Sequence, residues 1–144
     1  MYSPGHSGAS AYARVGVETG VMGANPHRLI VMLYQGARQA IAQARLHFQQ
    51  NNVGPRGEAI GKAIRIVDSG LRASLNLEAG GEVAQRLDAL YHYMTNRLFE
   101  ANATQSEPML VEVDRLLATL EEAWIGIAPE IAKMAAQPLP ERNR

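Results

Sequence analysis

Four stretches of this chain repeat apolar residues every three or four positions, and short polar segments separate them. That spacing is the period of an α-helix with one buried face, and no stretch shows the alternation of a β-strand. Short connections place successive helices antiparallel, so the sequence predicts an all-α protein, an antiparallel up-and-down four-helix bundle. The four stripes are Ile30, Leu33, Ala37, Ile41, Ala44 and Phe48; Ile60, Ile64, Val67, Leu71 and Leu75; Ala84, Leu87, Tyr91, Met94, Leu98 and Ala101; and Leu110, Val113, Leu117, Leu120, Trp124 and Ile127.

Residues with known terminal preferences mark where the helices begin. Asn25 is expected to cap the first helix, because Pro26 suits a first turn in which its missing N–H has no partner to lose. Ser106 and Pro108 are expected to do the same for the fourth helix. The segment QQNNVGPRG is expected to break the chain between the first and second helices.

A glycine pair divides the second stripe from the third. Gly80 and Gly81 are expected to end the second helix, because glycine adopts left-handed backbone at little steric cost. Glu82 then lies in the first turn of the third helix, where the positive end of the helix dipole favours a carboxylate. The sequence therefore predicts a tight turn between these two helices.

A bundle domain with a different segment at each end is the expected organisation, and 144 residues are a normal length for one domain. Residues 1–25 are rich in glycine and serine yet carry scattered apolar side chains, so we expect a mobile N-terminal arm. Residues 26–135 are expected to form the bundle, in which Pro129 either kinks the last helix or opens a short fifth helix. Residues 136–144 have little to bury, which is typical of a flexible tail.

Composition argues against several classes of protein. The 14 basic and 14 acidic side chains cancel, so no overall positive field favours nucleic acid. The chain has no cysteine, which excludes disulfides and thiolate metal sites. No segment has the ~20 apolar residues that cross a bilayer, and the start does not resemble a signal peptide. The sequence therefore predicts a cytoplasmic protein with no nucleic-acid partner and no stable membrane insertion.

Charge is nevertheless unevenly distributed along the chain. Basic residues outnumber acidic ones up to Asn76, and the remainder is correspondingly acidic. We expect the two halves to attract each other through solvated pairs that contribute about 0 to 1 kcal/mol each. A basic strip that recruits a partner is the alternative.

Catalytic and metal-binding constellations are missing from the sequence. A di-iron bundle requires glutamate with histidine three residues later, and this pattern does not occur. The four histidines are too scattered for a sequence-local metal site. Ser69 and Ser74 have no neighbouring base, and the glycine pair is better explained as a helix end than as a phosphate loop. The sequence predicts a protein that is not an enzyme and uses no cofactor.

Three blocks of sequence resemble one protein family, in the same order and at the same spacing. They are NPHRLIVMLYQGARQAI, SLNLEAGGEVAQRLDALYHYMTNRLFEAN and EVDRLLATLEEAW, and the likeness extends from about Tyr12 to Trp124. The family that they resemble is the flagellar secretion chaperone family, FliS. The resemblance implies a cytoplasmic, ATP-independent chaperone that binds the C-terminal segment of flagellin, prevents premature filament assembly and delivers flagellin to the flagellar export apparatus.

Apolar stripes wider than one core requires leave grooves between helices, into which a client helix can lay its own apolar residues. Tyrosine and methionine suit such a groove, because one tolerates water and the other adapts to irregular surfaces. Met32 and Tyr34 on the first helix are reserve candidates. The candidate flagellin-binding residues are Tyr12 on the arm, Leu71, Ser74, Leu75, Asn76 and Leu77 near the end of the second helix, and Leu90, Tyr91, Tyr93, Met94, Arg97 and Leu98 on the third.

Other interpretations of these residues stay open. Asn76 can cap the local backbone instead. Tyr12, with Val15 and Val17, is expected to cover the groove in the empty protein or to fill a static gap in the core. A generic four-helix adaptor or regulator that self-associates, for example as a homodimer, is the rival function. Five candidates also lie on a predicted core stripe, so packing in the core is the alternative role for them. They are Leu71, Leu75, Tyr91, Met94 and Leu98.

Overall fold

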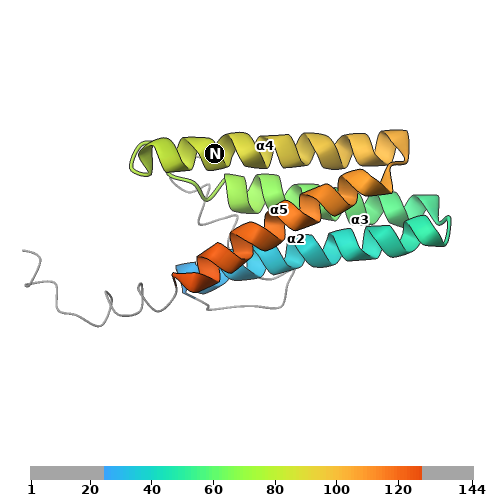
Figure 1. Ribbon diagram of the computed structural model, residues 1–144, viewed down its shortest axis with the longest axis horizontal. Coiled ribbons are helices and arrows are strands. Elements are labelled where there is room, and N and C mark those ends of the chain that lie inside the picture. Colours follow the sequence, from blue (N-terminus) through green and yellow to red (C-terminus); the bar gives the residue numbers. More distant parts are fainter. Residues whose placement is uncertain (1–24, 128–144) are drawn as a thin grey trace, which may run out of the picture.

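The computed structural model describes residues 25–127, and every regular element in that range is helical (Figure 1). The α3 helix continues directly into a π-helical turn, η1, so the two together form one rod of the bundle. The predicted all-α architecture of four helices is confirmed. The elements are α2 at Pro26–Gln49, α3 at Val53–Arg65, η1 at Ile66–Arg72, α4 at Gly81–Thr104 and α5 at Glu107–Gly126.

Consecutive helices run in opposite directions around the bundle (Figure 1). The rod of α3 and η1 contacts both α2 and α4, and α5 contacts the same two helices from another side. Figure 1 shows that α5 is oblique to the others: it begins beside the end of α4 and finishes beside the start of α2. The last helix therefore diverges from the first turns of α4.

The core consists of the faces that the stripes predict. Most stripe residues are buried, and Ile127 is exposed. The stripe residues that are only partly buried are Phe48, Ile64, Leu75, Leu87, Leu120 and Trp124. Removing the apolar surface of these side chains from water is the main force that holds the helices together. The largest fully buried side chains are Tyr91, Leu33, Ile41, Ile60, Ile66, Leu71, Met94, Leu98, Leu110, Leu117, Val67 and Val113.

The predicted helix starts are confirmed in position. Asn25 caps α2, since its side-chain oxygen accepts a 2.7 Å hydrogen bond from the backbone N–H of Arg28, and Pro26 lies in the first turn. Ser106 precedes α5 with Pro108 in the first turn, but the Ser106 hydroxyl makes no capping hydrogen bond. The expected cap of α5 is therefore correct in place and wrong in its bond.

The break between the first two helices is shorter than the sequence predicts. Helix α2 ends at Gln49 and α3 begins at Val53, so only three residues separate them, with Asn51 in left-handed backbone at φ 59°. Pro55 lies within the first turn of α3, where a missing N–H is tolerated. The proline that was expected to break the chain is thus part of the helix.

The predicted end of the second helix is wrong. Helical geometry stops at Arg72, well before the glycine pair. The Ser74 hydroxyl donates to the carbonyl of Leu71 at 2.7 Å, and the Asn76 side-chain oxygen accepts from the backbone N–H of Ala79 at 3.0 Å. Such local bonds compete with the helical hydrogen-bond ladder, so the chain from residue 73 to residue 80 forms turns instead.

Each glycine of the pair has a different role from the one expected. Gly81 has φ 59°, but it begins α4 rather than ending the preceding helix. Gly80 has an ordinary φ of −79°, yet a Cβ there would lie 2.6 Å from Ala84 Cβ and 2.8 Å from the carbonyl oxygen of Asn76. The close approach of Ala84 and the Asn76 carbonyl therefore requires glycine at position 80, and the left-handed backbone favours glycine at position 81. Glu82 does lie in the first turn of α4, as predicted.

Gly80→Ala is expected to lower the free energy of unfolding by about 2 kcal/mol, because its methyl group overpacks the turn. Gly81→Ala is expected to lower the free energy of unfolding by about 1 kcal/mol, because alanine is strained in left-handed backbone. No steric clash adds to this cost, since no atom lies within 4 Å of a Cβ there. Urea unfolding of both variants measures the two penalties. Equal stability of Gly80→Ala and the unchanged protein would show that the turn relaxes freely.

Several predictions fall outside the described range. Residues 1–24 and 128–144 hold most of the predicted arm with Tyr12, the position of Pro129 and the predicted tail. Within the described range, none of the helices combines the length and the apolar character that a bilayer crossing requires.

Candidate client-binding cleft

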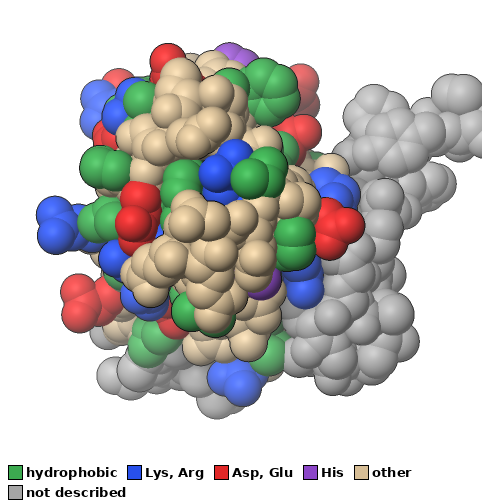
Figure 2. All heavy atoms as spheres, turned by 90° about the vertical axis from the view of Figure 1, so that its right-hand side faces the viewer, with side chains coloured by type: hydrophobic (Ala, Val, Ile, Leu, Met, Phe, Trp, Pro, Cys, Tyr) green, Lys and Arg blue, Asp and Glu red, His purple; other side chains and the backbone are tan. Residues whose placement is uncertain are grey.

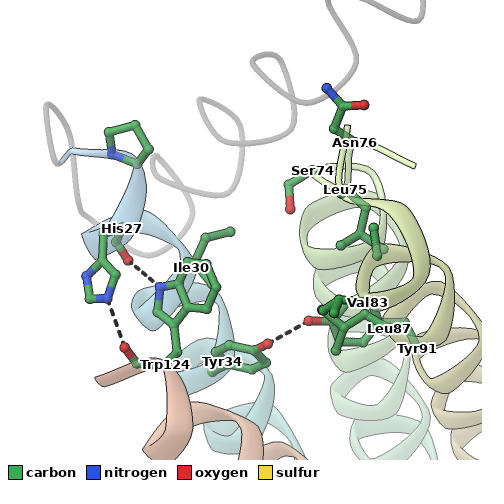
Figure 3. A pocket seen from close by; sticks show the side chains of 13 residues that line it. His27, Ile30, Tyr34, Ser74, Leu75, Asn76, Val83, Leu87, Tyr91 and Trp124 are labelled. Atoms are coloured by element: carbon green, nitrogen blue, oxygen red, sulfur yellow. Dashed lines mark hydrogen bonds between the residues drawn. The ribbon is translucent and has the colours of Figure 1, made fainter. Parts of the chain in front are cut away.

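A cleft with a volume of about 450 Å³ opens at the end of the bundle where α2 and α4 begin and α5 finishes (Figure 3). Its volume lies within the range of about 300 to 1,000 Å³ that is typical of ligand sites. In Figure 3, Ile30 and Trp124 face Leu75, Val83 and Leu87 across the cleft. The full lining is Pro26, His27, Ile30 and Tyr34 from α2, Ser74, Leu75, Asn76 and Gly80 from the turn, Val83, Ala84, Leu87 and Tyr91 from α4, and Trp124 from α5.

Ion pairs hold α5 against α2 along most of its length. Arg45 Nε lies 3.1 Å from Glu107 Oε2 in the first turn of α5. Arg38 donates to Asp114 Oδ1 and to Glu121 Oε1, each at 3.0 Å. The hydrogen bond to Asp114 is the largest cause of a raised pKa at Arg38, and the bond to Glu121 is the next. The guanidinium therefore stays charged. Basic residues of the first half thus pair with acidic residues of the second, as the charge distribution predicts.

The polar contacts between α4 and α5 lie near the start of α5. The Tyr93 hydroxyl donates a hydrogen bond to Glu112 Oε2, and Arg97 Nε donates one to Glu112 Oε1 at 2.8 Å. Beyond this point α5 follows α2, so its last turns move away from the first turns of α4 (Figure 1). The space that remains between them is the cleft.

His27 and Trp124 join the start of α2 to the end of α5, and we call this pair the His27–Trp124 clip. His27 Nε2 lies 2.9 Å from the carbonyl oxygen of Trp124 and donates to it, since a carbonyl can only accept. Trp124 Nε1 donates in return to the carbonyl oxygen of His27 at 3.1 Å. The two rings are stacked, with centroids 5.3 Å apart and an interplanar angle of 13°.

Two tyrosines join the walls at the base of the cleft. The hydroxyl oxygens of Tyr34 and Tyr91 lie 2.6 Å apart and share a hydrogen bond (Figure 3). Burial raises the pKa of Tyr34, and the bond to Tyr91 offsets only part of that increase. The Tyr34 phenol is therefore neutral at physiological pH, and the base of the cleft is polar but uncharged at this position.

The turn after η1 forms the wall opposite α2. Arg72, the last residue of η1, donates to Asp88 Oδ1 of α4 at 2.7 Å and to Asp68 Oδ1 at 3.4 Å. The second contact is an ion pair between residues four positions apart on η1. These bonds attach the end of η1 to α4 just before the chain reaches Ser74, the first residue of that wall.

Four predicted site residues meet in the cleft: Ser74, Leu75, Asn76 and Tyr91 line it together. Leu77 follows them in the same turn and is exposed, although it does not line the cleft. The reserve candidate Tyr34 also lines the cleft, whereas Met32 does not. Ser74, Leu75 and Asn76, which the sequence placed near the end of the second helix, thus lie in the turn that forms one wall.

The remaining described candidates lie elsewhere. Leu71, Met94 and Leu98 are fully buried in the core, where no side-chain surface is open to a docked partner. Leu90 is partly buried against the same core. Tyr93 and Arg97 lie on the side of α4 that faces Glu112, outside the cleft.

Most of the other cleft residues, on both walls, were not among the sequence-based candidates. Trp124 and Leu87 lie on the predicted stripes, and their positions near helix ends were the available signal, because core coverage is weakest there. Val83 and His27 lie off every stripe, so periodicity could not select them. The cleft residues outside the candidate set are Pro26, His27, Ile30, Gly80, Val83, Ala84, Leu87 and Trp124.

Glu112 gives the surface between α4 and α5 a pH dependence. The hydrogen bond from Tyr93 lowers the pKa of Glu112 below its ordinary value of 4.5, and Arg97 lowers it further against the opposing effect of burial. A lowered pKa in the folded state stabilises the protein above pH ~4.5, and this contribution is lost as pH falls through the folded-state value.

Glu112→Gln is therefore expected to be less stable than the unchanged protein at pH 7 and to converge with it below pH ~4.5. Urea unfolding at a series of pH values measures the convergence. Glu122→Gln, at an exposed glutamate of the same helix, is the control. Parallel acid profiles for Glu112→Gln and the unchanged protein would contradict the assignment.

Metal chemistry has no support in the described range, where His, Asp and Glu side chains form no group of three that could hold an ion.

Comparison with known proteins identifies the family. A sequence model of the family described as "Flagellar protein FliS" matches residues 8–131. The chain is 48% identical over 124 residues to the flagellar secretion chaperone FliS of Salmonella typhimurium, a match that covers 86% of this chain and 92% of that protein. It is 45% identical to the flagellar secretion chaperone FliSB of Pseudomonas aeruginosa, over 81% of this chain and 92% of that protein. It is 41% identical to FliS of Escherichia coli, over 81% of this chain and 86% of that protein. Similarity of this extent, on an all-helical bundle with an apolar cleft at its end, means that the chain belongs to the FliS family of flagellar secretion chaperones.

Proposed function

We propose that this protein is a cytoplasmic flagellar export chaperone that binds the C-terminal segment of flagellin in the cleft, keeps that segment from polymerising, and delivers flagellin to the flagellar export apparatus. Membership of the FliS family supports the chaperone role, because the similar proteins are named flagellar secretion chaperones. The apolar cleft between α2, α4 and α5 is the observation that carries the binding role.

The cleft has the chemistry that an amphipathic client helix requires. Its lining is largely aliphatic and aromatic, and the first turn of α4 offers Val83 with 68% of its surface exposed. A helix that lays apolar side chains at i, i+3 and i+4 into such a groove buries them without nucleotide hydrolysis. Covering a free apolar segment of this kind reduces its tendency to aggregate before export.

The proposed contacts follow from position in the cleft. Leu75, Val83 and Trp124 present apolar surface to the client, and Ser74 and Asn76 provide polar groups beside it. Buried candidates such as Leu71, Met94 and Leu98 then support the walls as core residues.

Trp124 makes the proposal directly testable. It is the single tryptophan of the chain, and it lines the cleft. A peptide of the flagellin C-terminal segment that contains no tryptophan is expected to change the Trp124 emission until equimolar peptide is bound, and to gain helical circular dichroism. A scrambled peptide of the same composition is the control. If the emission is unchanged and calorimetry detects no heat of binding, the proposal is wrong.

Sedimentation of the same samples separates the chaperone from the self-associating adaptor. The chaperone is expected to form an equimolar complex with the peptide. Mass that increases with protein concentration in the absence of peptide, and that the peptide does not change, would favour the adaptor.

A further inference from the structure

The His27–Trp124 clip lies where α5 is farthest from α4. Its two residues are 97 positions apart in the chain, yet two reciprocal hydrogen bonds and a ring stack join them. Both residues line the cleft, and Figure 3 shows them on the wall opposite the first turns of α4. Trp124 also lies within the last turn of α5.

We propose that the His27–Trp124 clip positions the end of α5 so that the cleft is already open before a client binds. This inference rests on the proposed function for the identity of the client. His27 and Trp124 are then positioning residues: their bonds to each other hold one wall in place, in addition to any surface that Trp124 offers to the client.

The distribution of bonds along α5 supports this role. Ion pairs with α2 occur at Glu107, Asp114 and Glu121, and the clip at Trp124 continues that series to the last turn. Without the clip, the end of α5 is free to approach α4, because closing the cleft removes apolar surface from water. A closed cleft must reopen before it accepts a helix.

Loss of preorganisation has a kinetic signature that differs from loss of a contact. If only a fraction of the molecules is open, the apparent affinity and the association rate are multiplied by that fraction, whereas the dissociation rate of the bound complex changes little. A residue that contacts the client acts mainly on the dissociation rate. The two roles can therefore be separated by measuring both rates.

The interactions of the clip can be removed one at a time. His27→Ala removes the ring and the donor, His27→Phe keeps a ring for stacking, and His27→Gln keeps an N–H donor for the Trp124 carbonyl. We expect the two conservative variants to fall between the unchanged protein and His27→Ala. They also keep the proposal testable if His27→Ala does not fold.

The first experiment needs no client. The chain has no cysteine, so Gln85→Cys on α4 and Glu122→Cys on α5, both at exposed positions, can carry a pair of spin labels at unique sites. We expect one narrow distance distribution in the otherwise unchanged protein, and a broader distribution that includes shorter distances when His27→Ala is added. An identical distribution in both proteins would overturn the proposal.

The second experiment measures association and dissociation of the flagellin C-terminal peptide by stopped flow. His27→Ala is expected to lower the association rate about tenfold, equivalent to ~1.4 kcal/mol, with the dissociation rate changed less than about twofold. Arg45→Gln is the matched control, because it breaks an ion pair between the same two helices away from the cleft. Val83→Ala, at a proposed contact, is expected to raise the dissociation rate instead.

The outcomes separate this inference from the proposed function. An unchanged association rate for His27→Ala, or an effect confined to the dissociation rate, would overturn the positioning role while the chaperone function stands. An equal effect of Arg45→Gln would also overturn it, because general loosening of α5 would then suffice. If the unchanged protein binds no peptide, the proposed function fails, and the distance distributions alone decide whether the clip holds the cleft open.

Discussion

Val83→Asp is expected to lower the affinity for the flagellin C-terminal peptide about a hundredfold, which corresponds to ~3 kcal/mol. Val83 lies in the first turn of α4 and lines the cleft with 68% of its surface exposed. A client helix that covers a carboxylate there removes its water without supplying a partner, and this desolvation opposes binding. Calorimetric titration with the peptide measures the loss.

The fold is expected to survive this substitution. A carboxylate in the first turn of a helix interacts favourably with the helix dipole, so the free energy of unfolding should be unchanged within about 1 kcal/mol. Val53→Asp is the matched control, because Val53 is a 62% exposed valine in the first turn of α3 and does not line the cleft. Equal affinity for the peptide in both variants would show that the peptide does not bind in the cleft.

Val53 belongs to the opposite end of the bundle, where the α2–α3 connection lies. Figure 2 shows that end of the described bundle, on which apolar side chains are scattered among acidic and basic ones. Single exposed apolar side chains of this kind are ordinary on protein surfaces and do not by themselves mark a binding site. The control therefore changes an exposed valine, also in the first turn of a helix, that does not line the cleft.

Leu98→Ala is expected to have the largest effect on stability, a loss of about 3 kcal/mol in the free energy of unfolding. Leu98 is 0% exposed and packs in the core, so removing its side chain leaves a cavity that neighbouring helices cannot fill completely. Urea unfolding measures the loss. A domain of this kind is stable by about 5 to 15 kcal/mol, so most molecules are expected to stay folded after this loss. The affinity of the folded protein for the peptide is therefore expected to stay within about threefold.

Leu77→Ala is the control for that experiment, since Leu77 was also a candidate but is 45% exposed in the turn before α4. It is expected to cost less than about 1 kcal/mol of stability. If Leu98→Ala instead retained stability and lost peptide affinity, Leu98 would be a client contact that becomes accessible when the bundle opens. This pair of variants therefore decides whether the buried candidates act in packing or in binding.

Local signals predicted the helices well where a single periodic stripe was available. Ile41, Val113 and Leu117 were each assigned to the core from spacing alone, and each is fully buried. Spacing succeeds here because the period of the helix and the burial of one face are properties of neighbouring residues. Helical spacing does not separate core from cleft at Tyr91, which packs in the core with 2% of its surface exposed and also lines the cleft.

The second helix shows where local signals fail. Its apolar stripe continues to Leu75, yet helical geometry stops at Arg72, after the π-helical turn. Bonds made by the side chains of Ser74 and Asn76 compete with the ladder, and ion pairing of Arg72 with Asp88 attaches the end of η1 to α4. That attachment depends on a helix further along the chain, which a helical period does not report.

By itself, the sequence determined the all-helical class and the family, because these follow from local spacing and from the order of sequence blocks. The same blocks supplied Ser74, Leu75 and Asn76 as candidate site residues, although not the turn that they form. Only the tertiary structure decided that α5 leans toward α2 and leaves a cleft beside α4. That lean depends on bonds between distant residues, above all His27 with Trp124, and on ion pairs whose partners no periodic pattern identifies.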